Sequence, residues 1–249
     1  ARGGERLGLL YLETGAGQRP SKVIYDRAPS AIREVRSDDF DWDAILAGTQ
    51  WFHFSGTAPA LGESVRRVLG DALEAARRLG VTVSCDCNYR SKLWSIEEAG
   101  RVLTPLVERV NVLLCGREDL QKLFGISGSS EAEAAEMMRK RFGLECVAST
   151  IRQGISASVN RWSALLCRAD GVFQGRQYEI EIVDRIGGGD AFAAALIYGI
   201  LAGDPPQRII DFAVAASALK HTIPGDFNLV TREEVEQLLA GDQSGRVQR

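Results

Sequence analysis

Three consecutive glycines followed by an aspartate lie within an apolar stretch, residues 182–201, and these residue types suit the binding of an anion. A β-branched, strand-like segment runs into Gly187, Gly188 and Gly189, and an alanine-rich, helix-like segment follows. Because glycine has no Cβ, the backbone here can take positive φ and a ligand can approach its N–H groups. The first N–H groups of a helix lack internal partners and lie at the positive end of its dipole. The stretch therefore predicts a site for phosphate or a developing oxyanion.

Asp190 stands at the start of this predicted helix, where the positive field favours the ionised carboxylate. A bound hydroxyl could reach the carboxylate, so Asp190 is a candidate general base. The alternative is a tight strand-to-helix turn in which Asp190 only caps the helix. The spacing is not G-x-G-x-x-G, and G-x-x-x-x-G-K-[ST] occurs nowhere, which disfavours dinucleotide-binding and Walker-type loops.

A second polar cluster, residues 86–94 (DCNYRSKLW), directly follows another predicted strand. The planar guanidinium of Arg90 suits a carboxylate, which it can bind through two parallel hydrogen bonds. The alternative is a surface loop in which Arg90 pairs with Asp86. Two short strands, residues 7–13 and 22–27, precede the main body of the chain and predict a hairpin-like flap.

From residue 42 onward, strand and helix patterns alternate. Predicted strands cover residues 51–55, 81–86, 110–114 and 146–150, and predicted helices cover residues 62–79, 96–108, 118–123 and 131–141. This succession predicts an α/β fold whose central, mostly parallel sheet is flanked by helices. Ligands bind beyond the carboxyl ends of such strands. We expect three polar clusters to converge there, namely residues 86–90, 115–118 and 187–190.

The remaining elements are shorter. Strands are predicted near residues 156–160, 163–168 and 178–183. After the glycine stretch, Asp204 is the predicted N-cap of a helix with Pro205 at its first position. A last helix covers residues 232–239.

The composition is that of an ordinary globular protein, with 45% hydrophobic and 25% charged residues among 249. This length predicts one domain over residues 1–249. A net charge of −3 argues against nucleic acid or an anionic membrane as partner. Five cysteines without a regular framework predict reduced thiols in a cytoplasm, and His53 and His221 lack the ligand spacing of a zinc site. The sequence predicts neither a transmembrane run nor a signal peptide.

The glycine stretch resembles a signature of the ribokinase-like (PfkB-type) carbohydrate kinases. Asp184, Gly187, Gly189 and Asp190 match D-x-x-G-x-G-D, usually D-T-x-G-A-G-D, and Arg185 replaces the threonine. The resemblance implies a ribokinase-like fold with a small β-strand lid. It also implies that Asp190 takes the proton from a sugar hydroxyl while the amides of the three glycines hold the transferring phosphoryl group, with ATP and Mg²⁺ as cofactors.

Two further segments resemble the 2-keto-3-deoxygluconate (KDG) kinases, the members of this family that phosphorylate a sugar acid. Residues 86–94 match their D-x-N-x-R-x-x-L-W stretch, and residues 11–28 match their lid. The resemblance implies substrate contacts from a set of polar and aromatic side chains: Tyr11, Tyr25, Arg27, Asn88 and Arg90. Each has an ordinary structural alternative, such as a cross-strand aromatic pair beside a solvated arginine for the lid residues.

The same family match places weaker expectations elsewhere. Glu118 occupies the position of the family's N-x-x-E motif and would hold Mg²⁺ through water, although Cys115 stands where the asparagine is expected. Glu118 could equally be a first-turn acid of a helix. Asp226, in the loop at residues 221–228, would lie near the sugar. The nucleotide side would use three residues: Arg152, Asp184 and Asn228.

The family's first strands, which hold a glycine-glycine-asparagine motif, are expected before residue 1. The resemblance therefore implies an ATP-dependent sugar-acid kinase that converts 2-keto-3-deoxygluconate to 2-keto-3-deoxy-6-phosphogluconate. Its expected partners are small molecules, and the lid strands could serve for self-association. Two alternatives stay open: a kinase of a neutral sugar, of the fructokinase or ribokinase type, and a non-catalytic sugar-binding protein.

Overall fold

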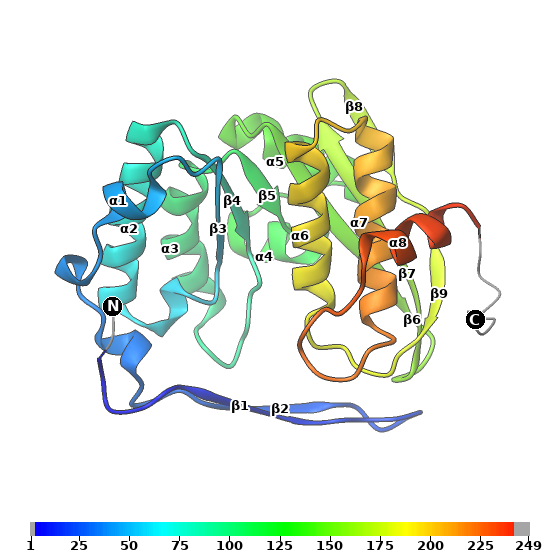
Figure 1. Cartoon of the computed structure of the whole chain (residues 1–249), viewed down its shortest axis with the longest axis horizontal. Coiled ribbons are helices and arrows are strands. Elements are labelled where there is room, and N and C mark those ends of the chain that lie inside the picture. The colour runs from blue at the N-terminus through cyan, green and yellow to red at the C-terminus, as the bar shows by residue number, and fades with distance from the viewer. Residues whose placement is uncertain (1–2, 242–249) are drawn as a thin grey trace. The chain divides into compact units, whose positions relative to one another are not determined.

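The computed structural model describes residues 3–241 (Figure 1). In this part of the chain, the main sheet has seven strands in the order β3-β4-β5-β6-β7-β8, with β9 paired to β7. β1 and β2, the lid strands, form a separate two-stranded sheet. β3 to β6 pair in parallel. The predicted fold class is confirmed: a mostly parallel sheet flanked by helices, with a small strand lid.

The elements follow the predicted alternation closely. The strands are β1 Leu9–Glu13, β2 Lys22–Asp26, β3 Trp51–Ser55, β4 Thr82–Asp86, β5 Val112–Leu114, β6 Cys146–Gly154, β7 Val159–Arg168, β8 Gly171–Gln174 and β9 Tyr178–Glu181. The α-helices are α1 Trp42–Leu46, α2 Glu63–Leu79, α3 Ile96–Val107, α4 Arg117–Phe124, α5 Glu131–Phe142, α6 Gly188–Leu201, α7 Pro206–Lys220 and α8 Arg232–Leu239. Short 3₁₀ turns occur at Ala31–Glu34, Ser37–Asp39 and Pro59–Leu61.

These elements form two compact units. Unit 1 comprises residues 3–12, 23–149 and 167–171, and unit 2 comprises residues 13–22, 150–166 and 172–241. Neither unit contains a helix with the length and apolar character needed to cross a membrane, as far as residues 3–241 are concerned.

Unit 1 is organised by the parallel strands β3, β4 and β5 and by the helices between them. α2 presents one apolar stripe to the core, and the side chains at its helical spacing are buried: Val65, Val68, Leu69, Ala72, Ala75 and Ala76. α3 begins where predicted, because the Ser95 side chain accepts a hydrogen bond from the Glu98 amide at 3.1 Å. Cys85 and Cys87 are fully buried, as expected for small apolar side chains on a strand end.

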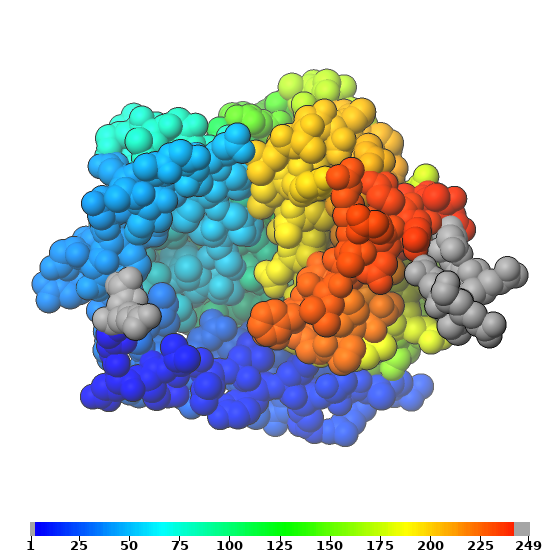
Figure 2. All heavy atoms as spheres, in the orientation of Figure 1, coloured from blue at the N-terminus to red at the C-terminus, as the bar shows by residue number. Residues whose placement is uncertain are grey.

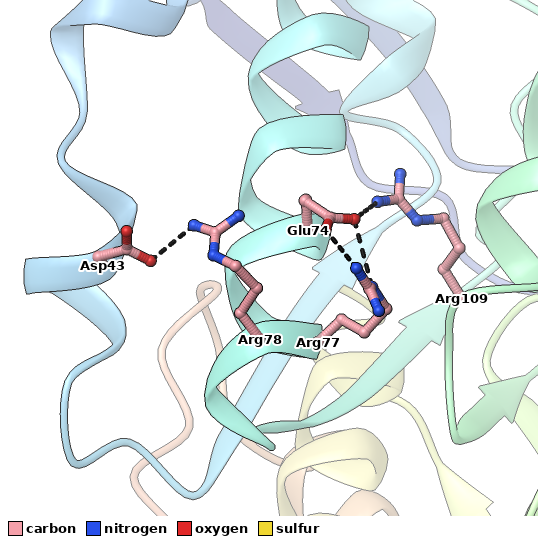
Figure 3. Close-up of polar contacts among 5 residues, drawn as sticks. All are labelled: Asp43, Glu74, Arg77, Arg78 and Arg109. Carbon is pink, nitrogen blue, oxygen red and sulfur yellow. Dashed lines mark hydrogen bonds and ion pairs between the residues drawn. The ribbon is translucent and has the colours of Figure 1, made fainter.

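Charged side chains connect the exposed face of α2 to its neighbours (Figure 3). Glu74 accepts hydrogen bonds from Arg77 at 2.5 Å and from Arg109 at 3.1 Å, and Arg78 contacts Asp43 of α1 at 2.7 Å. The hydrogen bond from Arg77 is the main cause that lowers the pKa of Glu74. These pairs are solvent-exposed, so they orient the end of α2 and contribute little to the free energy of unfolding.

Unit 2 is built on α6 and α7, which lie side by side, with α8 packed against α7 (Figure 1). α6 is apolar on nearly every face, and α7 is apolar and buried over most of its length from Ile209 onward, whereas Gln207, Arg208 and Asp211 are its polar side chains near the start. β7 and β9 pair antiparallel, with Asn160 opposite Ile180 and Arg161 opposite Glu179. Figure 2 shows α6 in yellow, with the segment after α7, orange to red, beside it.

Two local predictions were wrong. Residues 156–160 and 163–168 were predicted as separate strands, but β7 runs unbroken through Arg161, whose guanidinium lies 3.5 Å from Glu179 on β9. α7 starts one residue later than predicted, at Pro206, with Pro205 as its N-cap. Because a residue before proline is disfavoured in the helical region, Pro205 adopts an extended ψ of 144° and cannot be the first helical residue.

Candidate functional site

The three-glycine turn, Gly187 to Gly189, forms the start of α6 in unit 2. Gly187 is the N-cap and has a φ of +78°, a conformation that favours glycine. The Asp184 carboxylate supports the turn, because its Oδ1 accepts from the Ile186 amide and its Oδ2 accepts from the Gly225 amide, each at 3.0 Å. The glycines therefore make a tight strand-to-helix turn with N–H groups at a helix N-terminus. We call these three residues the glycine nest.

Gly188 is the buried member of the nest, and the end of α7 packs directly against it. A Cβ added to Gly188 would lie 2.4 Å from Cε1 of His221. The Ser217 hydroxyl donates to the Gly188 carbonyl, and His221 Nδ1 lies hydrogen-bonded to the Ser217 carbonyl, both at 2.7 Å. Trp162 covers the imidazole with ring centroids 5.0 Å apart. The nest therefore rests on a buried network from α7.

Asp190 lies in the first turn of α6, and its side chain is exposed. It does not cap the helix, since the N-cap is Gly187 and, within residues 3–241, the Asp190 carboxylate accepts no hydrogen bond from the first amides of α6. The alternative in which Asp190 serves only as a cap is therefore wrong. The carboxylate is free to meet a ligand beside the N–H groups of the nest, which is the arrangement that general-base chemistry requires.

A pocket of about 610 Å³ lies within unit 2 between the lid tip and the ends of β6 and β7. Its walls include two cationic side chains, Arg152 and Arg185, so we call it the two-arginine pocket. Arg185 is held in place, because its guanidinium donates to the Ala157 carbonyl at 2.5 Å and, with the Asn160 amide oriented so that its oxygen faces the arginine, to Asn160 Oδ1 at 2.8 Å. Burial, and secondly the charge of Arg152, lower the pKa of Arg185. Two neighbouring guanidinium groups favour an anionic ligand.

The lid tip, residues 13–22, belongs to unit 2 and is attached at this pocket. The Gly17 amide donates to the Ser158 hydroxyl at 3.0 Å, and the Gly17 carbonyl accepts from the Ala157 amide at 2.8 Å. These bonds fix the tip above residues 156–158 of the β6–β7 turn.

A second pocket in unit 2, of about 230 Å³, lies between α6, α7 and the segment that leads to α8. Most of its lining is apolar, including Ala195, Phe212 and Val235. Asn228, predicted to contact the nucleotide, lines this pocket, and its Oδ1 accepts from the Val230 amide at 3.1 Å. An apolar pocket with one amide side chain suits a flat heterocycle.

The residues predicted to contact a sugar acid lie mostly in unit 1. Asn88 has a φ of +41°, and its Nδ2 donates to Ser55 Oγ at 2.9 Å. Arg90 is exposed, and its Nη1 donates to the Tyr89 carbonyl at 3.0 Å. On the lid, the Arg27 guanidinium lies 4.7 Å from the centre of the Tyr25 ring, so these two side chains share a face, as residues two apart in an extended segment do.

The other two predicted substrate contacts are exposed. Tyr11, on the other lid strand, is 55% exposed. Asp226 lies in unit 2, and a Cβ on Gly187 would lie 2.6 Å from the Asp226 carbonyl oxygen. The loop that carries Asp226 thus contacts the nest.

Glu118, predicted to hold a metal through water, lies in the first turn of α4 in unit 1. Its side chain is 86% exposed and its Oε2 contacts Lys122 Nζ at 3.0 Å, which lowers the pKa of Glu118. Within residues 3–241, no three histidine, cysteine, aspartate or glutamate side chains are grouped so as to hold a metal ion. A magnesium ion here would need oxygen ligands from water and from phosphate in addition to the protein.

The sequence did not predict the roles of three residues around the nest, Ser217, Lys220 and His221, or the contacts of a fourth, Arg185. For two of them, Lys220 and His221, the sequence does contain an indication of burial. Lys220 and His221 end a helix whose preceding residues, 212–219, are all small or apolar, and such a segment is typical of a buried helix end. The replacement of threonine by Arg185 was noted, but its partners Ala157 and Asn160 come from a distant turn that the local pattern does not reveal.

The buried imidazole makes stability depend on pH. Burial lowers the pKa of His221 below its usual 6.5, and the positive charges of Arg185, Lys220 and Arg152 act in the same direction, while the hydrogen bond to the Ser217 carbonyl opposes them. The unfolded chain therefore binds this proton at a higher pH than the folded protein. The contribution of the neutral His221 imidazole to the free energy of unfolding is fully present above pH 6.5. This contribution is lost as the pH falls towards the pKa of His221 in the folded protein.

We expect the melting temperature to fall between pH 7.5 and pH 5.5, by about 2–4 °C for each kcal/mol lost. Thermal unfolding of His221→Gln should show a smaller fall over the same range than the unchanged protein. His53→Gln, which removes the other histidine of the sequence, is the control and should keep the full fall. An identical pH slope in His221→Gln would assign the effect to other groups.

Comparison with known proteins gives a consistent result. The model of the pfkB family of carbohydrate kinases matches residues 2–230. The chain is similar to a 2-dehydro-3-deoxygalactonokinase of Haloferax volcanii, with 35% identity over 240 residues, which span 96% of this chain and 72% of that protein. It is 31% identical over 222 residues to a 2-dehydro-3-deoxygluconokinase of Thermoproteus tenax, spanning 88% of this chain and 63% of that protein.

The fold is similar to the crystal structure of a 2-dehydro-3-deoxygluconokinase from Thermotoga maritima. The TM-score is 0.95 with 50% identity, and the match covers 97% of this chain and 75% of that one. The similarity therefore extends over almost all of this chain and over about three quarters of the length of its solved relative.

Proposed function

Because the chain belongs to the pfkB family of carbohydrate kinases, we propose that it transfers the γ-phosphoryl group of ATP to 2-dehydro-3-deoxygluconate, also called 2-keto-3-deoxygluconate. The observation that carries the proposal is the glycine nest with the exposed carboxylate of Asp190 beside it at the start of α6. The substrate class is supported by the 50% identity to the Thermotoga kinase and by the sugar-acid kinase of Haloferax. The product is the 6-phosphate of the sugar acid.

In the proposed reaction, the Asp190 carboxylate takes the proton of the C6 hydroxyl as its oxygen attacks the γ-phosphorus. The bond from the γ-phosphorus to the β,γ-bridging oxygen breaks, and ADP leaves with that electron pair. The amides of the glycine nest stabilise the negative charge on the transferring oxygens. Mg²⁺, when bound, neutralises part of the charge of the ATP phosphates, and Glu118 would hold it through water.

The nucleotide is assigned to unit 2. The apolar pocket that includes Asn228 suits the adenine base, and the two-arginine pocket suits phosphate oxygens through Arg152. Asp184 would act indirectly, because both of its carboxylate oxygens bind backbone amides of the nest and its neighbouring loop.

The sugar acid is assigned chiefly to side chains of unit 1. Arg27 and Arg90 supply guanidinium groups for the carboxylate, and Asn88 supplies an amide for a hydroxyl. Tyr11 and Tyr25 offer ring surface and hydroxyls from the lid strands. From unit 2, the exposed carboxylate of Asp226 would accept from a sugar hydroxyl.

The assignment of the two arginines predicts a selective loss of substrate affinity. We expect Arg90→Ala and Arg27→Ala each to raise KM for the sugar acid by about 10–100-fold, since a charge-assisted hydrogen bond contributes roughly 1.5–3 kcal/mol. KM for ATP should stay within about twofold. Arg101→Ala, which removes an exposed arginine on α3, is the matched control. An unchanged KM for the acid in both variants would instead favour a kinase of a neutral sugar.

The experiment that tests the function is ATP-dependent phosphorylation of a panel of sugars by the full chain. The panel comprises 2-keto-3-deoxygluconate, its galactonate epimer, gluconate, fructose and ribose, and the reaction is followed by ADP release. Turnover of the two deoxy sugar acids alone supports the proposal, and their ratio decides between the gluconate and galactonate types. Preference for fructose or ribose contradicts the substrate class, and sugar binding without turnover contradicts the kinase activity.

We also infer that two copies associate through the lid strands. An open two-stranded sheet exposes backbone edges that proteins usually cover. The lid and the segment before it expose several large apolar side chains: Leu7, Leu9, Leu10, Tyr11 and Ile24. A dimer in solution that dissociates in the Leu9→Glu variant would support this assembly, and a monomer at all concentrations would contradict it.

A further inference from the structure

Lys220, the last residue of α7, is 0% exposed. A buried ammonium is unfavourable unless hydrogen bonds or an opposite charge compensate for its lost hydration. Within residues 3–241, no carboxylate lies within ion-pair distance of Lys220. The compensation must therefore come from neutral groups.

Backbone carbonyl oxygens provide it. Lys220 Nζ donates to the Gly225 carbonyl at 2.9 Å and to the Ile223 carbonyl at 3.2 Å, so the side chain turns into the loop that follows its own helix. The negative end of the α7 dipole adds to this stabilisation. The ammonium is thus held by oxygen dipoles, as a bound monovalent cation would be.

The loop held by Lys220 is the one that contacts the glycine nest. Gly225 is bound on both sides, because its carbonyl accepts from Lys220 and its amide donates to Asp184, the residue that also holds the Ile186 amide. A Cβ on Gly187 would lie 3.2 Å from Cε of Lys220 and 2.6 Å from the Asp226 carbonyl oxygen. Lys220 and the loop therefore form the surface on which Gly187 rests.

We propose that Lys220 is a positioning residue of the glycine nest, whose buried ammonium holds residues 223–226 against Gly187 and thereby fixes the N–H groups of the nest. The consequence for catalysis rests on the proposed function, in which these N–H groups receive the transferring phosphoryl group. The ammonium also places a positive charge behind an anion site, where no mobile counterion is required.

Three substitutions separate the charge from the hydrogen bonds. Lys220→Met removes both, Lys220→Gln keeps N–H donors without the charge, and Lys220→Arg keeps the charge in a different shape. We expect kcat to fall about 10–10²-fold in the Met and Gln variants, since a displacement of about 1 Å in a reacting group can cost this much. KM for the sugar acid should stay within about threefold, and Lys220→Arg should keep more activity than Lys220→Gln. Full kcat in folded Lys220→Gln would overturn the role of the charge.

Hydrogen exchange tests the same proposal without any reaction. In Lys220→Met, amides in residues 183–190 and 221–228 should exchange faster than in the unchanged protein, while α2 should be unaffected. Ammonium chloride, but not sodium chloride at the same ionic strength, should restore part of the protection by supplying a free ammonium to the two carbonyls. Lys140→Met, which removes an exposed lysine on α5, is the control and should exchange normally.

Kinetics and hydrogen exchange together distinguish failure of the proposed function from failure of the positioning role. If the protein phosphorylates nothing but Lys220→Met loosens the nest, the proposed function fails and the positioning role stands. Unchanged exchange in folded Lys220→Met overturns the positioning role. If neither neutral variant folds, exchange in the unchanged protein decides. The Gly225 amide, which donates to Asp184, should then be protected, and exchange of this amide at the rate of an unbonded, exposed amide overturns the proposal.

Discussion

Asp190→Asn is expected to reduce kcat by about 10²–10⁴-fold, the usual contribution of a general base. Asparagine has nearly the same shape as aspartate but cannot take up the proton of a sugar hydroxyl. Asp190 is exposed and makes no capping bond to the first turn of α6, so the substitution should change neither the fold nor the glycine nest. The affinity for ATP should stay within a few-fold, because the proposed phosphate contacts are Arg152 and the nest amides.

Steady-state kinetics with saturating ATP and sugar acid measures this effect, with calorimetry of ATP binding to the same variant. Asp204→Asn is the matched control, since Asp204 stands beside the start of the next helix and contacts Arg208 at 3.6 Å. It should keep nearly full kcat. An Asp190→Asn enzyme that retains more than about a tenth of kcat would remove the assignment of Asp190 as base.

Gly188→Ala is expected to lower both stability and activity, whereas Gly189→Ala should lower activity alone. A Cβ on Gly188 would lie 2.4 Å from Cε1 and 2.8 Å from Nε2 of His221, and this ring is held by Ser217 and covered by Trp162. Overpacking of a buried contact costs about 1–3 kcal/mol, which is roughly 2–12 °C in melting temperature for a chain of this size. The same clash should displace the nest and reduce kcat by at least about tenfold.

Gly189→Ala is a control within the same nest, because a Cβ at Gly189 would meet nothing within 4 Å. Its melting temperature should be unchanged or slightly higher, since alanine favours helix more than glycine. If the phosphoryl group approaches the nest as proposed, this methyl group should still impair turnover. Thermal unfolding and kcat of the two variants give the comparison, and equal losses of melting temperature would contradict the geometry described for Gly188.

Much of the fold follows from short-range patterns. The apolar spacing of α2 predicts its buried face, the serine and glutamates at the start of α3 predict its N-cap, and short apolar runs predict the parallel strands. The unbroken course of β7 through Arg161 was not predictable in this way, since its support is the cross-strand partner Glu179. Two consecutive polar residues, here Asn160 and Arg161, indicate a break between two strands as long as the partner strand is not known.

In the candidate site, too, short-range patterns predict local features but not contacts between distant residues. The nest and Asp190 could be identified from four consecutive residues, and the lid contact of Tyr25 with Arg27 follows from the alternation of a strand. The packing of His221 against Gly188, and the contacts of Arg185 with Ala157 and Asn160, join residues about 30 positions apart. No local pattern records such contacts, because they arise from the way α7 and β7 pack around the turn.

The two bonds at Gly225 also determine which changes in length the loop after α7 can accept. The side chain of Lys220 reaches the Gly225 carbonyl and closes a ring that contains residues 220–225, while Asp184 holds the amide of the same glycine. The size of that ring is set by the number of residues in it. If a residue were added or deleted, a peptide group other than that of Gly225 would face Lys220 and Asp184. Among the described contacts, no similar pair of bonds closes the segment after Asn228 into a ring. Residues 220–225 therefore act as a spacer of fixed length, and insertions in related chains are expected beyond it.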